Sequence, residues 1–235
     1  MLTQILDSFL SVIYPKFCAA CLKNFNDPSL HLCQACQKNL TFLNTKEYCT
    51  TCFSIKELPI CPVCKITPSY FTALAAVFDY EGPAGFLIKK FKYEGVFRLA
   101  ASFGSFMTLQ FLNLNWPLPD IIVPVPQPFN RYLERGYNHS FLLAKMLSKQ
   151  IHVPCKELLR KSMKDLPQAA LNLEQRKNNA HQSIKLKKHG SVEDKIVLLI
   201  DDVMTTRTTL NASANALLGS NPKELYGLTL CKTNL

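Results

Sequence analysis

The stretch that decides the fold is Ile196–Leu210, IVLLIDDVMTTRTTL, in which an apolar run ends in two adjacent acids and then in threonines. A solvated loop has no need of the apolar run, and a core strand does not tolerate two neighbouring carboxylates. We therefore predict a buried strand over residues 195–200. Asp201 and Asp202 would stand at its carboxyl end, facing something charged.

The threonines after the acids predict a phosphate site. Residues 206–218 have a helical pattern, and a helix N-terminus presents unpaired N–H groups and positive dipole charge to an anion. Two carboxylates cannot bind a phosphate, so they need a second partner nearby, such as ribose hydroxyls or hydrated Mg²⁺. These features predict a ribose 5-phosphate derivative as ligand. Its phosphate would be held by Thr205, Thr206, Arg207, Thr208 and Thr209.

Strand and helix patterns alternate over the last two thirds of the chain. Continuous apolar strands separated by helices predict an α/β fold with a parallel sheet that is covered on both faces. In such sheets ligands bind beyond the carboxyl ends of the strands, where the two acids stand. Further strands are expected over 72–78, 120–125 and 225–231, and further helices over 83–93, 96–112 and 138–150.

A second loop, DIIVPVPQPFNRYLERGYNHS over residues 120–140, carries two arginines after a predicted strand. Its prolines favour a rigid turn. Arg131 and Arg135 follow at a spacing of four residues, before Gly136 and a new helix. Arginines at the end of a parallel strand suit a polyphosphate. The alternative is that both are ordinary surface arginines.

Eight of the ten cysteines form four Cys-x-x-Cys pairs within 47 residues. A disulfide framework would require a secreted chain. The N-terminus MLTQILDSFLSVIYPKF has no basic residue before Lys16 and no small-residue cleavage site, so we expect no signal peptide. An uncharged apolar run of about 18 residues, which a membrane span requires, is also missing from the sequence. We therefore expect a cytoplasmic protein with reduced thiols.

Reduced thiols at this spacing predict zinc. A Cys-x-x-Cys loop turns both sulfurs toward one ion, and a second pair completes a closed, structural Cys₄ site. Four pairs give one or two sites, whether the pairing is sequential or interleaved. We predict a zinc-ribbon module over residues 1–69, with an amphipathic helix over 1–17, and a second domain over 70–235. The candidate ligands are Cys18, Cys21, Cys33, Cys36, Cys49, Cys52, Cys61 and Cys64.

The positive charge lies outside the zinc module. The formal net charge is +10, and residues 156–188 hold nine Lys or Arg against three Asp or Glu. A basic segment of this kind attracts polyanions, although it can also be a solvated surface loop. Aromatic side chains near the arginines would add stacking for single-stranded DNA, unless they pack in the core. The candidates are Phe129, Tyr132 and Tyr137.

The stretch 196–210 resembles the phosphoribosyl-pyrophosphate (PRPP) motif of type I phosphoribosyltransferases. In that motif four apolar residues precede two acids and a loop of the form Thr-Gly-x-Thr. The resemblance implies ribose contacts for Asp201 and Asp202. Arg207 departs from the pattern, because it stands where the motif has glycine, which permits positive φ and close backbone approach. Its guanidinium is an alternative phosphate contact.

The motifs together, in order along nearly the whole chain, resemble the ComF family of competence proteins. They are the Cys-x-x-Cys ribbons, Phe91-Lys-Tyr-Glu-Gly95, the VPVP…RxxxRGYN loop, a basic segment and the PRPP-like motif. The resemblance implies an N-terminal zinc-binding part and a type I phosphoribosyltransferase-like domain. It also implies the handling of incoming single-stranded DNA in natural transformation, or the use of DNA as a nutrient.

The resemblance also assigns individual positions. Arg131, Arg135, Gly136 and Asn138 match an RxxxRGxN element on the pyrophosphate side of the site, while His139 departs from a glutamine. A Lys-Tyr pair after the first strand matches without a role that the residues themselves explain. The basic segment would lie over the mouth of the site. Lys92 and Tyr93 match the Lys-Tyr pair, and Gln168 and Arg176 match the basic segment.

Three functions follow as hypotheses. The first is a cytoplasmic factor that binds single-stranded DNA, carries a PRPP-type ligand site and cooperates with other competence proteins such as a helicase. The second is an active phosphoribosyltransferase using PRPP and Mg²⁺ with an unspecified acceptor. Asp201 and Asp202 would hold the ribose and metal, and Arg131 and Arg135 would stabilise the departing pyrophosphate. The third is a zinc-ribbon adaptor with a vestigial PRPP site. We favour the first.

Overall fold

A computed structural model describes residues 17–25, 31–56, 58–161 and 184–233 of the chain. The predicted N-terminal helix therefore lies outside the described residues, except for its last position. The middle of the basic segment, residues 162–183, lies outside them as well. No helix in the described ranges is long and apolar enough to cross a membrane.

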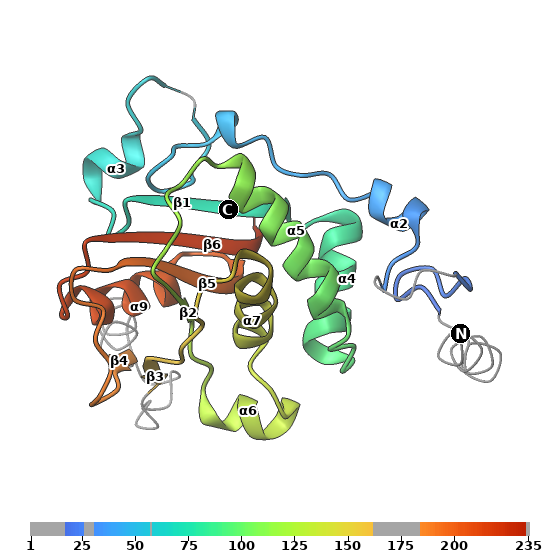
Figure 1. Cartoon of the computed structure of the whole chain (residues 1–235). Helices are drawn as coiled ribbons and strands as arrows, with labels where there is room; N and C mark the ends of the chain where they lie inside the picture. The colour runs from blue at the N-terminus through green and yellow to red at the C-terminus, as the bar shows by residue number, and fades with distance from the viewer. Residues whose placement is uncertain (1–16, 26–30, 57, 162–183, 234–235) are drawn as a thin grey trace, which may run out of the picture.

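The centre of the molecule is a four-stranded parallel sheet with strand order β1-β6-β5-β2 (Figure 1). Nearly every strand residue is buried, as expected of a parallel sheet with both faces covered. The sheet confirms the predicted α/β class and all four predicted strands. Their bounds are Ala73–Asp79 (β1), Ile121–Pro124 (β2), Ile196–Met204 (β5) and Glu224–Lys232 (β6).

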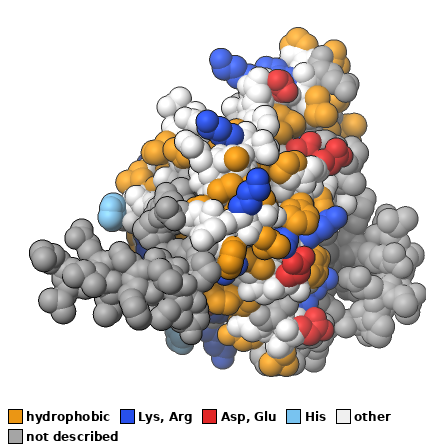
Figure 2. Space-filling model, turned by 90° about the vertical axis from the view of Figure 1, so that its right-hand side faces the viewer, with side chains coloured by type: hydrophobic (Ala, Val, Ile, Leu, Met, Phe, Trp, Pro, Cys, Tyr) orange, Lys and Arg blue, Asp and Glu red, His pale blue; other side chains and the backbone are white. Residues whose placement is uncertain are grey.

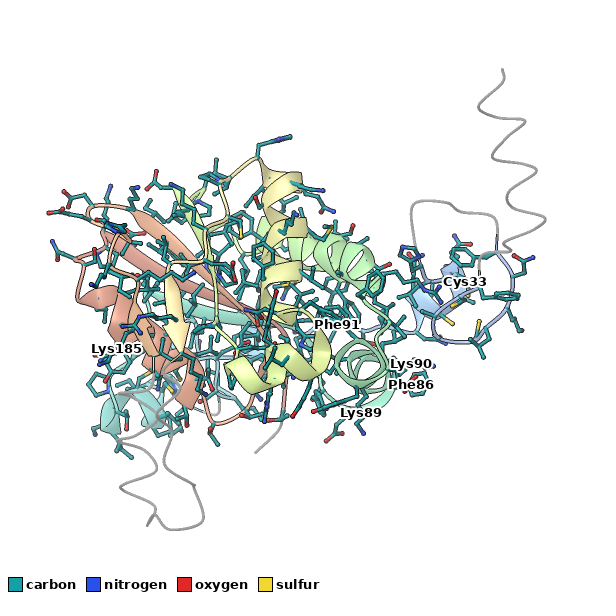
Figure 3. All side chains as sticks on the ribbon, turned by 90° about the horizontal axis from the view of Figure 1, so that it is seen from below. Cys33, Phe86, Lys89, Lys90, Phe91 and Lys185 are labelled. Carbon is teal, nitrogen blue, oxygen red and sulfur yellow. The ribbon has the colours of Figure 1, made fainter. Side chains whose placement is uncertain are left out.

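Helices cover both faces of the sheet. Helices α5 and α7 pack against each other on one face, and α9 lies on the other (Figures 1 and 3). Each was predicted to within a few residues, because its apolar positions recur at helical spacing. The bounds are Gly82–Tyr93 (α4), Leu99–Asn113 (α5), His139–Ile151 (α7) and Thr208–Leu218 (α9).

Three short elements that follow β2 were not predicted. Helix α6 (Phe129–Arg135) follows the proline-rich turn, and Gly136 ends it with a φ of 76°. Strands β3 (Leu159–Lys161) and β4 (Ile184–Leu186) pair antiparallel and form a two-stranded ribbon that contacts α9. The ribbon is built from the two ends of the predicted basic segment.

The cysteines form two modules of the same design. In each, one Cys-x-x-Cys pair lies in a turn and the other begins a short helix, α2 (Gln34–Lys38) or α3 (Pro62–Ile66). A 3₁₀ helix, η1 (Thr45–Glu47), precedes the second module. The first module, marked by Cys33 in Figure 3, lies at the opposite end of the molecule from Lys185 of the ribbon.

The chain around the second module covers the outer edge of the sheet. Phe42 pairs antiparallel with Phe78 of β1, and the Leu43 N–H donates to the Val77 carbonyl at 2.9 Å. Further along, the Leu74 N–H donates to the Thr50 carbonyl at 3.0 Å. The segment between the two cysteine modules therefore satisfies backbone groups that an exposed edge strand would leave open.

Candidate functional site

The two acids lie within β5, because this strand continues to Met204, four residues beyond the end that the sequence predicted. The expectation that the strand stops before the acids was wrong, since side chains from two helices, Ser140 and Lys92, compensate the two carboxylates inside the sheet. Asp201 is 8% exposed, and its Oδ1 accepts hydrogen bonds from Ser140 Oγ at 2.8 Å and from the Asp202 N–H at 2.9 Å. Lys92 Nζ of α4 lies 2.9 Å from Asp202 Oδ1. The pair is thus compensated by one ammonium group and one hydroxyl before any ligand binds.

Burial of the pair changes its acid–base chemistry. Burial, and then the neighbouring charge of Asp202, raise the pKa of Asp201 to about 7. Burial lowers the pKa of Lys92, but the charge and hydrogen bond of Asp202 more than offset this effect, so that this pKa lies above its ordinary value. Near neutral pH Asp201 therefore lies close to the balance between its protonated and ionised forms, and a cation bound beside it would favour the ionised form.

The threonine loop leads directly into α9. The Thr206 and Thr208 hydroxyls lie 2.9 Å apart, and Thr208 is the first residue of the helix. Arg207, the N-cap, has a φ of 60°. The left-handed backbone that glycine provides in the PRPP motif is therefore present here at a non-glycine residue, at a cost of about 1–2 kcal/mol.

The side chain of Arg207 connects the loop to the second cysteine module. Its Nη1 donates to the carbonyl of Cys52 at 2.9 Å, across 155 positions of sequence. Lys232 lies close by at the end of β6, with Nζ 5.1 Å from the centre of the Tyr48 ring. Burial and the Arg207 cation lower the pKa of Lys232, against the opposing effect of Asp79. Two cations, Arg207 and Lys232, thus lie beside the threonine loop.

The arginine loop lies at the end of β2, on the other side of the acids. Arg131 is exposed on α6, and Arg135 is the last residue of that helix. Asn138 caps α7, since its side chain accepts from the Ser140 and Phe141 N–H groups and donates to the Val125 carbonyl. Both arginines follow the end of β2 on α6, and their contact with a ligand stays a prediction.

Each cysteine module gathers four thiols in one place. All sulfurs within a cluster lie within 4.8 Å of one another. The Cys52–Cys61 and Cys49–Cys64 sulfurs are 3.5 and 3.8 Å apart, and the Cys21–Cys33 sulfurs are 3.8 Å apart. A tetrahedral zinc with Zn–S distances of about 2.3 Å requires a separation of about 3.8 Å. The clusters can therefore hold a metal each, and the pairing, left open by the sequence, is sequential.

Hydrogen bonds lower the pKa of one thiol in each cluster. Burial raises the pKa of Cys18, but N–H groups of Cys21 and Cys33 more than offset it and lower this pKa to about 6. Similarly, burial raises the pKa of Cys52, and hydrogen bonds with Ser54 lower it to about 6. A preformed thiolate is the state in which cysteine binds a metal.

Three functional contacts were missed by sequence reasoning. Lys92 was singled out only as part of a Lys-Tyr pair, without a role, and now proves to be the partner of Asp202. Ser140 carries no distinguishing signal beyond its place after a predicted N-cap. The Cys52 carbonyl could not have been found, because a backbone group has no sequence signature.

Comparison with known proteins supports the same organisation. The phosphoribosyl transferase domain family matches residues 138–234. Competence protein F of Haemophilus influenzae is 26% identical over 221 residues, covering 90% of this chain and 95% of that protein. The DNA utilization protein YhgH of Escherichia coli K12 is 28% identical over 210 residues, covering 86% and 90%. Competence protein ComFC of Bacillus subtilis is 25% identical over 210 residues, covering 81% and 79%.

Among solved structures, the chain resembles a purine phosphoribosyltransferase from Pyrococcus horikoshii, with 19% identity and a TM-score of 0.35 over 60% of this chain and 75% of that one. It also resembles the glutamine PRPP amidotransferase of B. subtilis, with 15% identity and a TM-score of 0.39. The second alignment covers 54% of this chain and 25% of the amidotransferase chain.

Proposed function

We propose, for a chain that belongs to the ComF family of competence and DNA utilization proteins, that it binds single-stranded DNA and carries a ligand site for PRPP or a related ribose 5-phosphate. The family membership supplies the context of DNA handling. The chain's own residues supply the contacts, and two regions contribute them.

The observation that carries the DNA proposal is the charge of the β3–β4 ribbon. Arg160 is directly opposite Lys185 in the antiparallel register, and both side chains are exposed. Like charges directly opposite each other destabilise a strand pair. A polyanion lying along the ribbon would remove that repulsion, and Lys156, Lys187 and Lys188 extend the same exposed positive surface.

The face shown in Figure 2 is less suited to this role. On this face, Lys and Arg side chains are scattered among apolar and acidic ones. Of the aromatic candidates near the arginine loop, Tyr137 packs against Phe91 and Phe97, whereas Tyr132 is 48% exposed and free to stack on a base. The ribbon therefore provides phosphate neutralisation, and Tyr132 is the described aromatic on the arginine loop suited to stacking.

Binding of a labelled single-stranded oligonucleotide over a series of salt concentrations tests the proposal. The variant replaces Arg160, Lys185 and Lys187 with glutamine. Its matched control replaces three exposed lysines of the cysteine modules, Lys38, Lys46 and Lys65. Each lost phosphate contact reduces the slope of log K against log salt by about 0.7, so we expect the ribbon variant to lose about 2 units of slope.

The control should retain the wild-type slope. An affinity that does not respond to salt, or an equal loss of slope in both triple variants, would contradict a specific role of the ribbon. Circular dichroism of each variant checks that the fold is intact.

The PRPP-type site is formed by the two acids of β5 and by the threonine loop between the end of β5 and the start of α9. Carboxylates of Asp201 and Asp202 are suited to accept hydrogen bonds from ribose hydroxyls, and the loop hydroxyls and helix N-terminus to hold a phosphate. Bound Mg²⁺ would supply charge compensation between the pair and a pyrophosphate. Since Lys92 already neutralises Asp202, binding requires this ion pair to rearrange.

A phosphoribosyltransferase activity is the second candidate, favoured by the family match over residues 138–234 and by the acid pair near a strand end. It would be shown by release of pyrophosphate from PRPP in the presence of an acceptor and lost on replacing both acids by asparagine. We further propose that both cysteine clusters bind zinc, because four thiols at tetrahedral spacing favour that ion.

A further inference from the structure

A cavity of about 400 Å³ lies between the second cysteine module and the phosphate loop. One wall is made by residues 52–55 with Pro62 and Val63. The opposite wall is made by residues 204–207 and by the end of β6, residues 232–233. The cavity is within the size range of small-molecule pockets, about 300–1,000 Å³.

The two walls differ in chemistry. The wall from the cysteine module presents apolar side chains, among them Phe53, Ile55 and Val63. The wall from the sheet presents hydroxyls and the cations Arg207 and Lys232. A ligand that satisfies both walls has an anionic group at one end and a flat or apolar body at the other.

Contacts across the interface keep the two walls apart at a defined distance. The Arg207 guanidinium is bonded to the Cys52 carbonyl, and Lys232 lies over the Tyr48 ring. Tyr48 in turn stacks on Phe53, with ring centres 4.5 Å apart and an interplanar angle of 14°. The position of the apolar wall thus depends on the cysteine module being folded.

We propose that this cavity binds the base of a nucleoside 5′-monophosphate unit, whose phosphate lies on the threonine loop and whose base lies against the second cysteine module. The inference rests on the proposed ribose-phosphate site and specifies its ligand class. It makes the second module part of the ligand site and leaves the first module outside it. The unit can come from a free nucleotide or from the 5′-phosphorylated end of a DNA strand.

Calorimetric titration of two ligands tests the base contact. Adenosine 5′-monophosphate carries the base, and ribose 5-phosphate has the same sugar and phosphate without it. A stacked or apolar base contact contributes about tenfold or more in affinity, so the nucleotide should bind the wild type at least that much more tightly. Substitution Ile55→Asn, which changes the apolar wall without adding a charge beside the phosphate, should lower the affinity for the nucleotide toward that for ribose 5-phosphate.

A matched control is available in the same module. Ile66 is 82% exposed on α3 and Ile55 is 54% exposed, but only Ile55 lines the cavity. Ile66→Asn should therefore retain the full preference for the nucleotide. Equal affinity of the wild type for the two ligands, binding of neither, or an equal loss in both variants would overturn the proposal.

Two oligonucleotides of one sequence, with and without a 5′-phosphate, identify the source of the unit. Tighter binding of the phosphorylated strand than of either the other strand or the nucleotide assigns the site to DNA ends. If the nucleotide binds the cavity and the 5′-phosphate makes no difference to the affinity of the strand, the site is assigned to free nucleotides. Both results support the cavity as a nucleotide site.

The ribbon experiment separates this inference from the proposed DNA function. A protein that binds single strands through the ribbon but does not distinguish the two small ligands retains the DNA function and loses the cavity proposal. A protein that prefers the nucleotide but binds no DNA does the reverse.

Discussion

The two cysteine modules have the same local structure in different surroundings. In each, the residue before the first cysteine pairs antiparallel with a residue seven positions later, Phe17 with Asn24 and Tyr48 with Ile55. In each, the residue after the second cysteine has a left-handed backbone, with φ of 59° at Leu22 and 56° at Phe53. The cysteine turn has thus been built twice in the same way.

What differs is the structure that each module contacts. The first lies at the end of the molecule next to α4 (Figure 1). Its His31 N–H donates to Ser102 Oγ of α5 at 3.3 Å, and its Leu22 is 64% exposed. The second contacts the threonine loop through the Cys52 carbonyl, and its Phe53 is 2% exposed. The two cysteine turns have the same geometry, so the difference between the modules lies in the part of the fold that each one contacts.

Removing the ligands of one cluster at a time should give the largest contrast. A structural zinc contributes about 10–16 kcal/mol to the folding of a small module, so a variant without two of its thiolates loses that module. We expect Cys49→Ser/Cys52→Ser to reduce PRPP affinity by about tenfold or more, because the loop then loses its Cys52 contact.

The matched pair Cys18→Ser/Cys21→Ser should retain PRPP affinity within about twofold, since the first module has no described contact with the loop. Zinc content and calorimetric titration measure both outcomes. Equal losses of affinity in the two variants would show that the modules do not differ in role.

The two left-handed residues give the next contrast. Phe53→Gly removes a buried ring that stacks on Tyr48 and should destabilise the protein by about 3–5 kcal/mol. Leu22→Gly removes an exposed side chain and relieves a left-handed backbone, so we expect a change within about 1 kcal/mol, toward greater stability. Urea unfolding measures both, and similar destabilisation by the two substitutions would contradict the different burial of the turns.

The smallest effect concerns one contact of the second module, the hydrogen bond from Arg207 to the Cys52 carbonyl. Arg207→Ala loses the hydrogen bond to Cys52 and should destabilise by about 1–2 kcal/mol. Arg207→Gly loses the same bond but relieves the positive φ, and should recover about 1 kcal/mol of that loss.

Hydrogen exchange locates this effect. The Phe53 and Leu22 amides donate to Cys49 and Cys18 in equivalent turns. In Arg207→Ala we expect faster exchange at Phe53 and unchanged exchange at Leu22. Faster exchange at both amides, or at neither, would show that Arg207 does not hold the second module specifically.

The regular elements were predictable because their signals are local. Strand β1 was expected over 72–78 and observed over Ala73–Asp79, since a buried parallel strand is a near-continuous apolar run. Strands β3 and β4 were missed, because three-residue strands rich in Lys and Arg contain no such run. Helix α6 was missed because prolines precede it and it is only seven residues long.

The sequence by itself determined the eight thiols of the two clusters, the parallel sheet, and the acids and threonines near the end of β5. Each of these is encoded within a window of a few residues, by spacing or by a run of one residue type. Only the tertiary structure decided that Lys92 neutralises Asp202, that Arg207 contacts Cys52, and that the second module forms a wall of the cavity. Those contacts depend on how distant segments dock, which follows from many weak packing interactions summed over the fold and from no single stretch of sequence.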